Sequence, residues 1–156
     1  MIEMVLKKNK KVIRLLNQAA DLLELEGANE YRIRAFRGAA KNVAVHDTEL
    51  DQMVQNGEPL THIDGVGDHL ASRIREIVLT GHLKEIDELK RRLPHSLQSL
   101  LNLPELSPKK IQRLYLELGI NNLDELYWAI ENGQVQALTG FDEQTVHQLR
   151  EHLQSL

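Results

Sequence analysis

The stretch that decides the fold is IDGVGDHLASRI, residues 63–74. Two glycines one residue apart, Gly65 and Gly67, interrupt an otherwise helical pattern of apolar residues. Because glycine adopts a positive φ without steric cost, both glycines favour a sharp hairpin at this point. A helix is then expected to begin at about Asp68, since the apolar residues that follow recur at helical spacing. The stretch therefore predicts two helical arms joined by a tight turn.

The start of the second arm is suited to bind an anion. Its first backbone N–H groups have no partner within the helix and lie at the positive end of the helix dipole. Gly67 has no side chain, so a phosphate can approach these amides closely. The hairpin residues Gly65, Val66 and Gly67 are therefore predicted to bind a nucleic-acid phosphate without reading a base.

The spacing of residues 63–74 resembles the helix-hairpin-helix motif of DNA-repair proteins. An apolar residue is followed by x-Gly-apolar-Gly, then by three residues, an alanine and an apolar residue three positions further on. The alternative interpretation is a corner between two helices that only shapes the fold.

Two later windows repeat this pattern, LPELSPKKIQRL over 103–114 and LTGFDEQTVHQL over 138–149. Positions 1, 4, 9 and 12 are apolar in all three windows, but the pair of glycines is not retained. The second window has Glu105 in place of the first glycine, and the third has Asp142 in place of the second. Since a carboxylate beside the amides repels a phosphate, these copies are expected to keep the packing and lose most of the binding.

Residues after the second hairpin can compensate for part of the phosphate binding that is lost with the glycines. Ser107 can cap the helix that follows it, and Lys109 and Lys110 lie in the first turn of that helix. Both lysines are therefore candidate DNA contacts, whereas the third copy is predicted to be structural.

A second candidate surface is the predicted helix EYRIRAFRGAAK, residues 30–41. Arg34, Arg37 and Lys41 fall at i, i+3 and i+7 and so share one outward face. An all-basic face without an acid partner repels itself, and an anion lying opposite would stabilise it. The alternative is a solubilising face, which more often carries both signs of charge.

Composition and charge limit the possible functions. The net charge of −4 argues against a general nucleic-acid binder. Residues 1–92 hold 15 basic and 15 acidic residues, whereas residues 93–156 hold 4 and 8, so a DNA-binding face is expected in the first part. There is no cysteine for a disulfide, no apolar run of membrane length and no signal-peptide core. We therefore expect a cytoplasmic protein, nucleoid-associated if bacterial.

The rest of the chain also shows helical periodicity. Further helices are expected over 5–26, 47–57, 83–93 and 119–128, and no segment alternates as a strand does. The predicted fold is an all-α helical bundle with one intact and two degenerate helix-hairpin-helix motifs. Two domains are expected, a DNA-binding domain over 1–92 and a helical subdomain over 93–156.

Nearly the whole chain matches one template in motif order and spacing. The matching segments are residues 29–40, 63–74, 80–83, 107–119 and 138–141. Together they resemble the N-terminal region of family X DNA polymerases, of the bacterial type and of polymerase beta. The resemblance implies a small lyase-like domain followed by a DNA-binding subdomain. The palm, whose aspartates hold two metal ions in that family, has no counterpart in these residues, so polymerase activity is not expected from this chain alone.

The resemblance also assigns roles to single positions. The family's lyase lysine, which forms a Schiff base with an abasic sugar, falls at Arg73. A guanidinium stays protonated and has no free lone pair, so Arg73 is expected to hold phosphate but not to attack an aldehyde. Two further phosphate-binding lysines of the family fall at His69 and Arg32. Lys41 or Lys84 could replace the nucleophile, but nothing in the spacing supports either.

Two other family features carry over. A tyrosine of the family's basic helix is Phe36 here, which keeps the ring and loses the hydroxyl. The hairpin carbonyls hold a monovalent cation in the family, and the corresponding ligands would be the backbone carbonyls of Thr61, Ile63 and Val66. No cofactor is expected apart from such a Na⁺ or K⁺ ion.

Three functions remain open at this point. The first is a non-catalytic module that binds gapped, nicked or single-strand/double-strand junction DNA near a 5′ phosphate in repair, with a repair protein as a further partner and no membrane. The second is a 5′-deoxyribose phosphate lyase with a displaced lysine nucleophile. The third is a protein-interaction scaffold, for which Tyr115, Tyr127 and Trp128 are candidate surface anchors.

Overall fold

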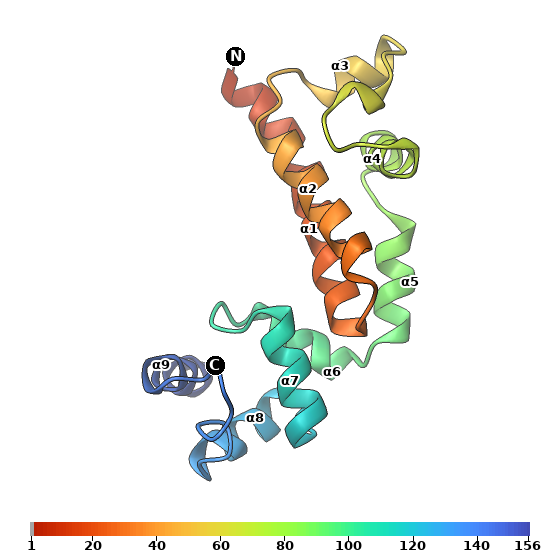
Figure 1. Cartoon of the computed structure of the whole chain (residues 1–156). Helices are drawn as coiled ribbons and strands as arrows, with labels where there is room; N and C mark the ends of the chain where they lie inside the picture. Colours follow the sequence, from red (N-terminus) through yellow and green to blue (C-terminus); the bar gives the residue numbers. More distant parts are fainter. Residues whose placement is uncertain (1) are drawn as a thin grey trace. The chain divides into compact units, whose positions relative to one another are not determined.

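The computed structural model describes residues 2–156, with side chains from Asn9 onward. Every regular element within residues 2–156 is a helix, nine of them α-helices and two of them short 3₁₀ turns (Figure 1). The prediction of an all-α fold is confirmed. None of the helices in this described part is both long enough and apolar enough to cross a membrane.

The chain divides into two compact units, Met1–Leu89 (unit 1) and Lys90–Leu156 (unit 2). The division falls within the helix α5 (Lys84–Arg92). Each unit has its own apolar core, and each is described by itself.

Unit 1 is built on a hairpin of two long helices, α1 (Ile2–Glu26) and α2 (Glu30–Ala44), which lie side by side (Figure 1). The chain reverses at Gly27, which has a φ of 80°. The side chain of Asn29 then accepts a hydrogen bond of 2.7 Å from the Tyr31 amide and so caps α2, as its residue type predicts.

The remaining elements of unit 1 pack on this pair. They are α3 (Leu50–Gln55), the 3₁₀ turn η1 (Leu60–His62), α4 (Asp68–Thr80) and the first part of α5. α4 ends at Gly81, whose left-handed φ of 79° allows its amide to bond back to Ile77. The core of the unit is formed by apolar side chains from all of these helices, among them Leu16, Leu23, Phe36, Met53, Ile74 and Leu89.

Unit 2 is a cluster of shorter helices. They are α6 (His95–Gln98), the 3₁₀ turn η2 (Ser99–Asn102), α7 (Pro108–Leu118), α8 (Leu123–Glu131) and α9 (Glu143–Ser155). Their core contains the fully buried side chains of Leu100, Ile111, Leu114, Leu126 and Ile130.

Two predicted helix boundaries were wrong. The helix expected over 47–57 begins at Leu50, after an extended Glu49. The helix expected over 119–128 begins at Leu123, because Gly119 has a φ of 69° and ends the preceding helix α7. Asn122 then caps α8 by accepting a hydrogen bond of 2.7 Å from the Glu125 amide.

One polar side chain of α1 is buried in the core of unit 1. Asn9 is 1% exposed, donates to the Thr48 carbonyl at 3.2 Å and accepts from the Leu50 amide at 3.1 Å. It therefore satisfies two backbone groups where the loop enters α3.

Replacing this side chain tests its role. Asn9→Ala is expected to lower the free energy of unfolding by about 1–3 kcal/mol, because it leaves buried backbone groups without a partner. Urea denaturation followed by circular dichroism measures the change. Asn56→Ala, at an exposed position after α3, is the control and should change stability little. Equal losses for the two variants would contradict this role.

Candidate functional site

The first hairpin begins at η1 and turns at Gly65, which has a φ of 76°. The Val66 amide donates a hydrogen bond of 3.1 Å to the Ile63 carbonyl, and both of these side chains are buried. The turn is thus closed by one backbone bond and anchored by two apolar side chains. The prediction of a tight turn at this point is confirmed.

Gly67 has a different role from Gly65. Its φ of −88° is open to any residue, so the expectation that both glycines provide the turn is wrong for Gly67. Gly67 precedes α4 as its N-cap, and no side chain caps the helix there. A Cβ placed on Gly67 would meet nothing within 4 Å, so the space beside the start of α4 is open at this residue.

The hairpin is tied to α2 by Asn42, a residue that the sequence analysis missed. Its side-chain amide donates a hydrogen bond of 2.7 Å to the Asp64 carbonyl. A Cβ on Gly65 would lie 2.7 Å from the same nitrogen. The glycine at this position is therefore required twice, by the turn and by the close approach of Asn42.

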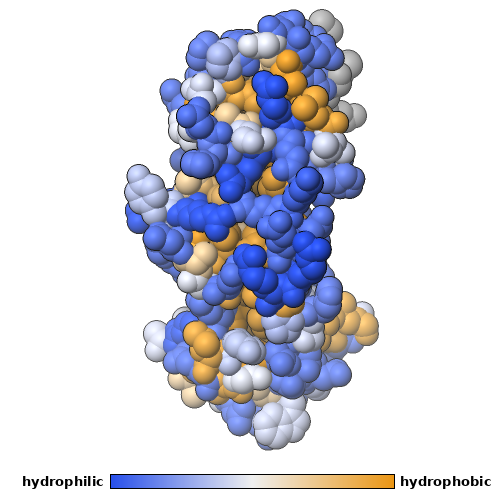
Figure 2. Space-filling model, turned by 90° about the vertical axis from the view of Figure 1, so that its right-hand side faces the viewer, coloured by the Kyte–Doolittle hydropathy of each residue, from blue (hydrophilic) through white to orange (hydrophobic). Residues whose placement is uncertain are grey.

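A pocket of about 750 Å³ lies between α2 and the start of α4. Of the predicted site residues it brings together Arg32, Gly65, Gly67, His69 and Arg73. Its other lining residues include the apolar Ala35, Phe36 and Leu70, the exposed Tyr31 and one carboxylate, Asp68. The view that faces α4 and α5 shows mostly hydrophilic side chains, with apolar residues visible between them (Figure 2).

Arg73 is held from several sides. Its guanidinium carbon lies 5.5 Å from the centre of the Phe36 ring, which is cation–π distance. Its Nε donates to Glu85 at 2.5 Å, and its Nη1 donates to the His69 carbonyl at 3.0 Å. Burial, and after it the positive charge of Arg32, lower the pKa of Arg73. Arg73 therefore contributes a positive charge to the pocket and also connects α4 to Phe36 of α2 and to Glu85.

Glu85, in the first turn of α5, is the other residue that the sequence analysis missed. One of its oxygens accepts from Nη2 of Arg73 at 3.2 Å and also pairs with Nη2 of Arg32. Its side chain is 14% exposed. One carboxylate therefore holds both arginines of the pocket.

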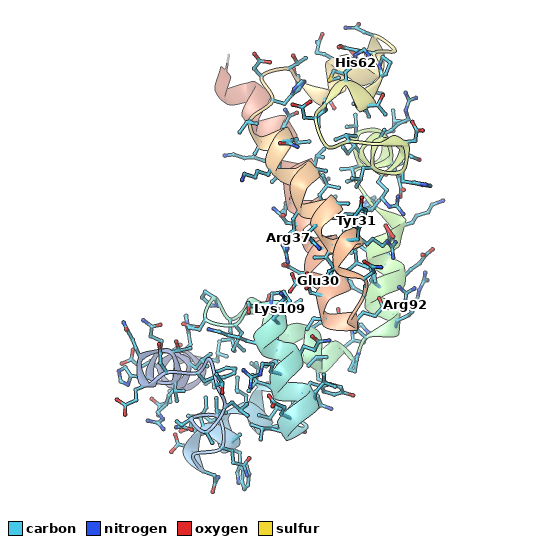
Figure 3. The ribbon with its side chains drawn as sticks, viewed as in Figure 1. Glu30, Tyr31, Arg37, His62, Arg92 and Lys109 are labelled. Carbon is cyan, nitrogen blue, oxygen red and sulfur yellow. The ribbon has the colours of Figure 1, made fainter. Side chains whose placement is uncertain are left out.

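The predicted basic face of α2 is only partly present. Arg37 pairs with Asp21 at 2.8 Å and with Glu24 at 3.0 Å, both on α1, so the expectation that this face has no acid partner is wrong. Burial lowers the pKa of Arg37, but the two carboxylates outweigh it, and the net effect is a raised pKa. Figure 3 shows Arg37 and Tyr31 on different sides of α2. Arg34 and Lys41 are exposed and do not line the pocket.

The three predicted copies of the motif share one backbone geometry. The bond from Val66 to Ile63 is repeated from Leu106 to Leu103 at 3.0 Å and from Phe141 to Leu138 at 3.4 Å. The shared backbone hydrogen bond confirms the threefold repeat that the apolar spacing predicted.

The copies differ in how their second helices begin. The Ser107 hydroxyl accepts from the Lys110 amide at 3.3 Å, and the Asp142 carboxylate accepts from the Thr145 amide at 2.7 Å. The latter hydrogen bond lowers the pKa of Asp142. The later copies therefore satisfy an amide with their own side chains, whereas the first does not.

The second and third copies are tied to each other within unit 2. Arg113 donates to the Thr139 carbonyl of the third hairpin, and His152 of α9 lies 2.6 Å from Glu105 of the second. Lys110, a predicted DNA contact, lies 5.8 Å from the centre of the Phe141 ring. The other predicted contact, Lys109, is exposed in the first turn of α7.

The predicted cation ligands are the carbonyls of Thr61, Ile63 and Val66. The Ile63 carbonyl already accepts from the Val66 amide, which leaves one lone pair for a cation. Within the described residues, no group of three or more histidines and acidic residues is placed to hold a metal ion.

Comparison with known families agrees with this geometry. Residues 7–83 match a family described as a helix-hairpin-helix domain, and residues 57–119 match a SAM-like helix-hairpin-helix tandem. The second range contains both the first hairpin and the second, and the third hairpin lies outside both ranges. The chain therefore contains helix-hairpin-helix domains within residues 7–119.

A curated relative places the chain more closely. It is 34% identical over 144 residues to the DNA polymerase/3'-5' exonuclease PolX of Bacillus subtilis (strain 168). The match covers 92% of this chain and 25% of the relative, so the chain spans about a quarter of the length of the relative it matches. Over the matched residues, the chain is therefore similar to the N-terminal part of a family X DNA polymerase.

The two glycines of the first hairpin can be tested against each other. Gly65→Ala is expected to lower the free energy of unfolding by about 1–3 kcal/mol, because alanine disfavours its φ and displaces Asn42. Gly67→Ala should leave stability within about 0.5 kcal/mol. Urea denaturation of both variants measures the difference, and a Gly67→Ala variant that is the less stable of the two would refute the assignment.

The cap of α9 predicts a dependence on pH. Because the folded protein lowers the pKa of Asp142, its carboxylate stabilises the fold above the unfolded pKa and loses that effect as pH falls through the folded pKa. Asp142→Ala is therefore expected to lower the melting temperature at neutral pH, with the difference from wild type shrinking below about pH 4. Asp142→Asn, which keeps a capping oxygen, is the control; a gap for Asp142→Ala that stays constant with pH would contradict the role.

Proposed function

We propose that this chain binds DNA through its backbone phosphates, and that the pocket of unit 1 holds a 5′ phosphate at a gap, nick or junction. The observation that carries the proposal is the uncapped start of α4 at Gly67, which opens into the pocket containing Arg32 and Arg73. Free amides at a helix N-terminus and guanidinium groups are the donors that phosphate oxygens prefer.

The recognition would be independent of base sequence. Amides and guanidinium groups of this pocket can contact phosphate oxygens, whereas base edges are read by side chains in a groove. Outside the pocket, the exposed Arg34 and Lys41 would contact further phosphates along the strand. Arg37 is left out of the proposed contacts, because Asp21 and Glu24 already hold it. Lys109 and Lys110 are proposed as weaker contacts of unit 2.

We also propose that the pocket does not catalyse a lyase reaction. Schiff-base chemistry needs a neutral amine beside the aldehyde. Among the described residues that line the pocket none is a lysine, and the position of the family nucleophile is Arg73. The exposed Lys41 and Lys84 lie outside the lining.

A monovalent cation would strengthen the same contact. The carbonyls of Thr61, Ile63 and Val66 are the proposed ligands, and an ion there would place a positive charge beside the bound strand. Carbonyl oxygens suit Na⁺ and K⁺, and the remaining lone pair of Ile63 permits such a contact.

The relative supports DNA as the ligand, since its printed name is that of a DNA polymerase and exonuclease. Both of those activities belong to a protein about four times as long as this match. The proposal takes from the relative only the DNA-binding context.

The proposal is tested by fluorescence anisotropy with gapped DNA that carries either a 5′ phosphate or a 5′ hydroxyl. Wild type is expected to bind the phosphorylated form about tenfold more tightly, and to weaken steeply between about 50 and 200 mM salt. Gly67→Ala should remove most of the preference, because its Cβ occupies the approach to the amides without disturbing the fold.

Arg73→Ala should also remove most of the preference, and Arg75→Ala is its matched charge control, since Arg75 is exposed on α4 but does not line the pocket. Arg75→Ala should change the salt slope while keeping the preference for the 5′ phosphate. Binding that ignores the 5′ phosphate would overturn the proposed pocket, and the absence of binding at low salt would overturn DNA binding altogether. Borohydride trapping on abasic DNA should yield no covalent adduct; an adduct would establish the lyase instead.

A further inference from the structure

The arginines proposed to bind phosphate are already bound to an anion of the protein. Glu85 accepts from Nε and Nη2 of Arg73 and pairs with Arg32 as well. The two oxygens of a carboxylate match the guanidinium fork in the same way as two oxygens of a phosphate. Glu85 therefore occupies donors that an incoming phosphate needs.

We propose that Glu85 is an internal competitor of the phosphate, and that this competition makes the pocket selective for a terminal phosphate over an internal phosphodiester. This inference rests on the proposed function. It assigns to Glu85, on α5, a part in specificity although it is not itself a contact to DNA.

The first step is the supply of donors. A guanidinium has five N–H groups, and Arg73 uses three of them within the protein, two toward Glu85 and one toward the His69 carbonyl. A phosphate that binds the same Nε and Nη2 donors of Arg73 must take the place of Glu85. Arg32 faces the same exchange, because its Nη2 pairs with the same oxygen.

The second step is the cost of that exchange. The displaced carboxylate remains beside the site, since Glu85 is 14% exposed and lies on a helix. A smaller pocket of about 390 Å³ adjoins it and is lined by further acids, Asp68, Glu76 and Glu88. The incoming anion must therefore outweigh nearby negative charge.

The third step is the charge of the ligand. A terminal phosphate monoester carries about −1.5 to −2 at neutral pH, whereas an internal phosphodiester carries a single negative charge. Only the terminal group brings more charge than the carboxylate that it replaces. The competition thus weakens binding to internal phosphates more than binding to a 5′ phosphate.

The test measures Kd for gapped DNA with a 5′ phosphate and with a 5′ hydroxyl, using wild type and Glu85→Gln. The variant keeps the size of the side chain and removes its charge. It should bind the 5′-hydroxyl DNA about threefold or more tightly than wild type does, and the ratio between the two DNAs should shrink. In an Arg32→Ala/Arg73→Ala background, which lacks both arginines that pair with Glu85, the effect of Glu85→Gln should largely disappear.

Asp87→Asn is the control, because it removes the same charge from an exposed position of α5 that lines neither pocket. It should shift both affinities alike and keep their ratio. A Glu85→Gln variant that keeps the wild-type ratio overturns the inference, and so does one that binds both DNAs more weakly, which would make Glu85 a positioning residue. If circular dichroism shows that Glu85→Gln does not fold, Glu85→Asp replaces it, because its side chain is shorter by one methylene and moves the carboxylate away from the arginines. Glu85→Asp must then lower the ratio of the two affinities as well, or the inference fails.

The measurements distinguish a failure of the proposed phosphate pocket from a failure of the role proposed for Glu85. Wild type that does not distinguish a 5′ phosphate from a 5′ hydroxyl overturns the proposed pocket, and the inference with it. Wild type that shows the preference, with a ratio unaltered in Glu85→Gln, overturns the inference alone.

Discussion

The hydrogen bond that the side chain of Asn42 donates to the Asp64 carbonyl fixes the first hairpin against α2. It joins the hairpin to α2, so the start of α4 and the residues Arg32 and Phe36 border one pocket. The contact requires a backbone without a side chain at Gly65, because any Cβ there would collide with Asn42. The third hairpin has a similar tie, since the corresponding carbonyl, that of Thr139, accepts from Arg113. In both cases a hairpin is fixed by a side chain of an earlier helix.

The first motif differs from its later copies in the residue that precedes its second helix. All three hairpins close with the same backbone bond, and ten of their twelve apolar positions are buried, whereas Ala71 and Leu138 are half-buried. At the start of the second helix, however, Ser107 and Asp142 supply an oxygen to an amide, and Gly67 supplies none. The same helix geometry thus serves internal stability in unit 2 and leaves donors available in unit 1.

The local elements could be predicted from the sequence because they follow from short-range rules. Apolar periodicity located the helices, and the residue types of Asn29 and Ser107 predicted their caps. The partners of charged groups could not be predicted, since they depend on how distant helices pack. Arg37 looked unpaired within α2, but its acids are on α1; Glu85 is 12 residues from Arg73, and nothing in that spacing shows that they meet. The hairpin was therefore located correctly, and the charge environment of the pocket was not.

The surroundings of Arg73 make its position resistant to single substitutions. Its planar group lies over Phe36 and contacts both Glu85 and a carbonyl of its own helix. A lysine there would offer one ammonium, which cannot make the fork and the stacked contact together. The ammonium would also lack the Nε–Nη2 pair through which Arg73 meets both oxygens of Glu85. Positions 73 and 85 are therefore coupled, since a substitution at either one removes the contacts of the other.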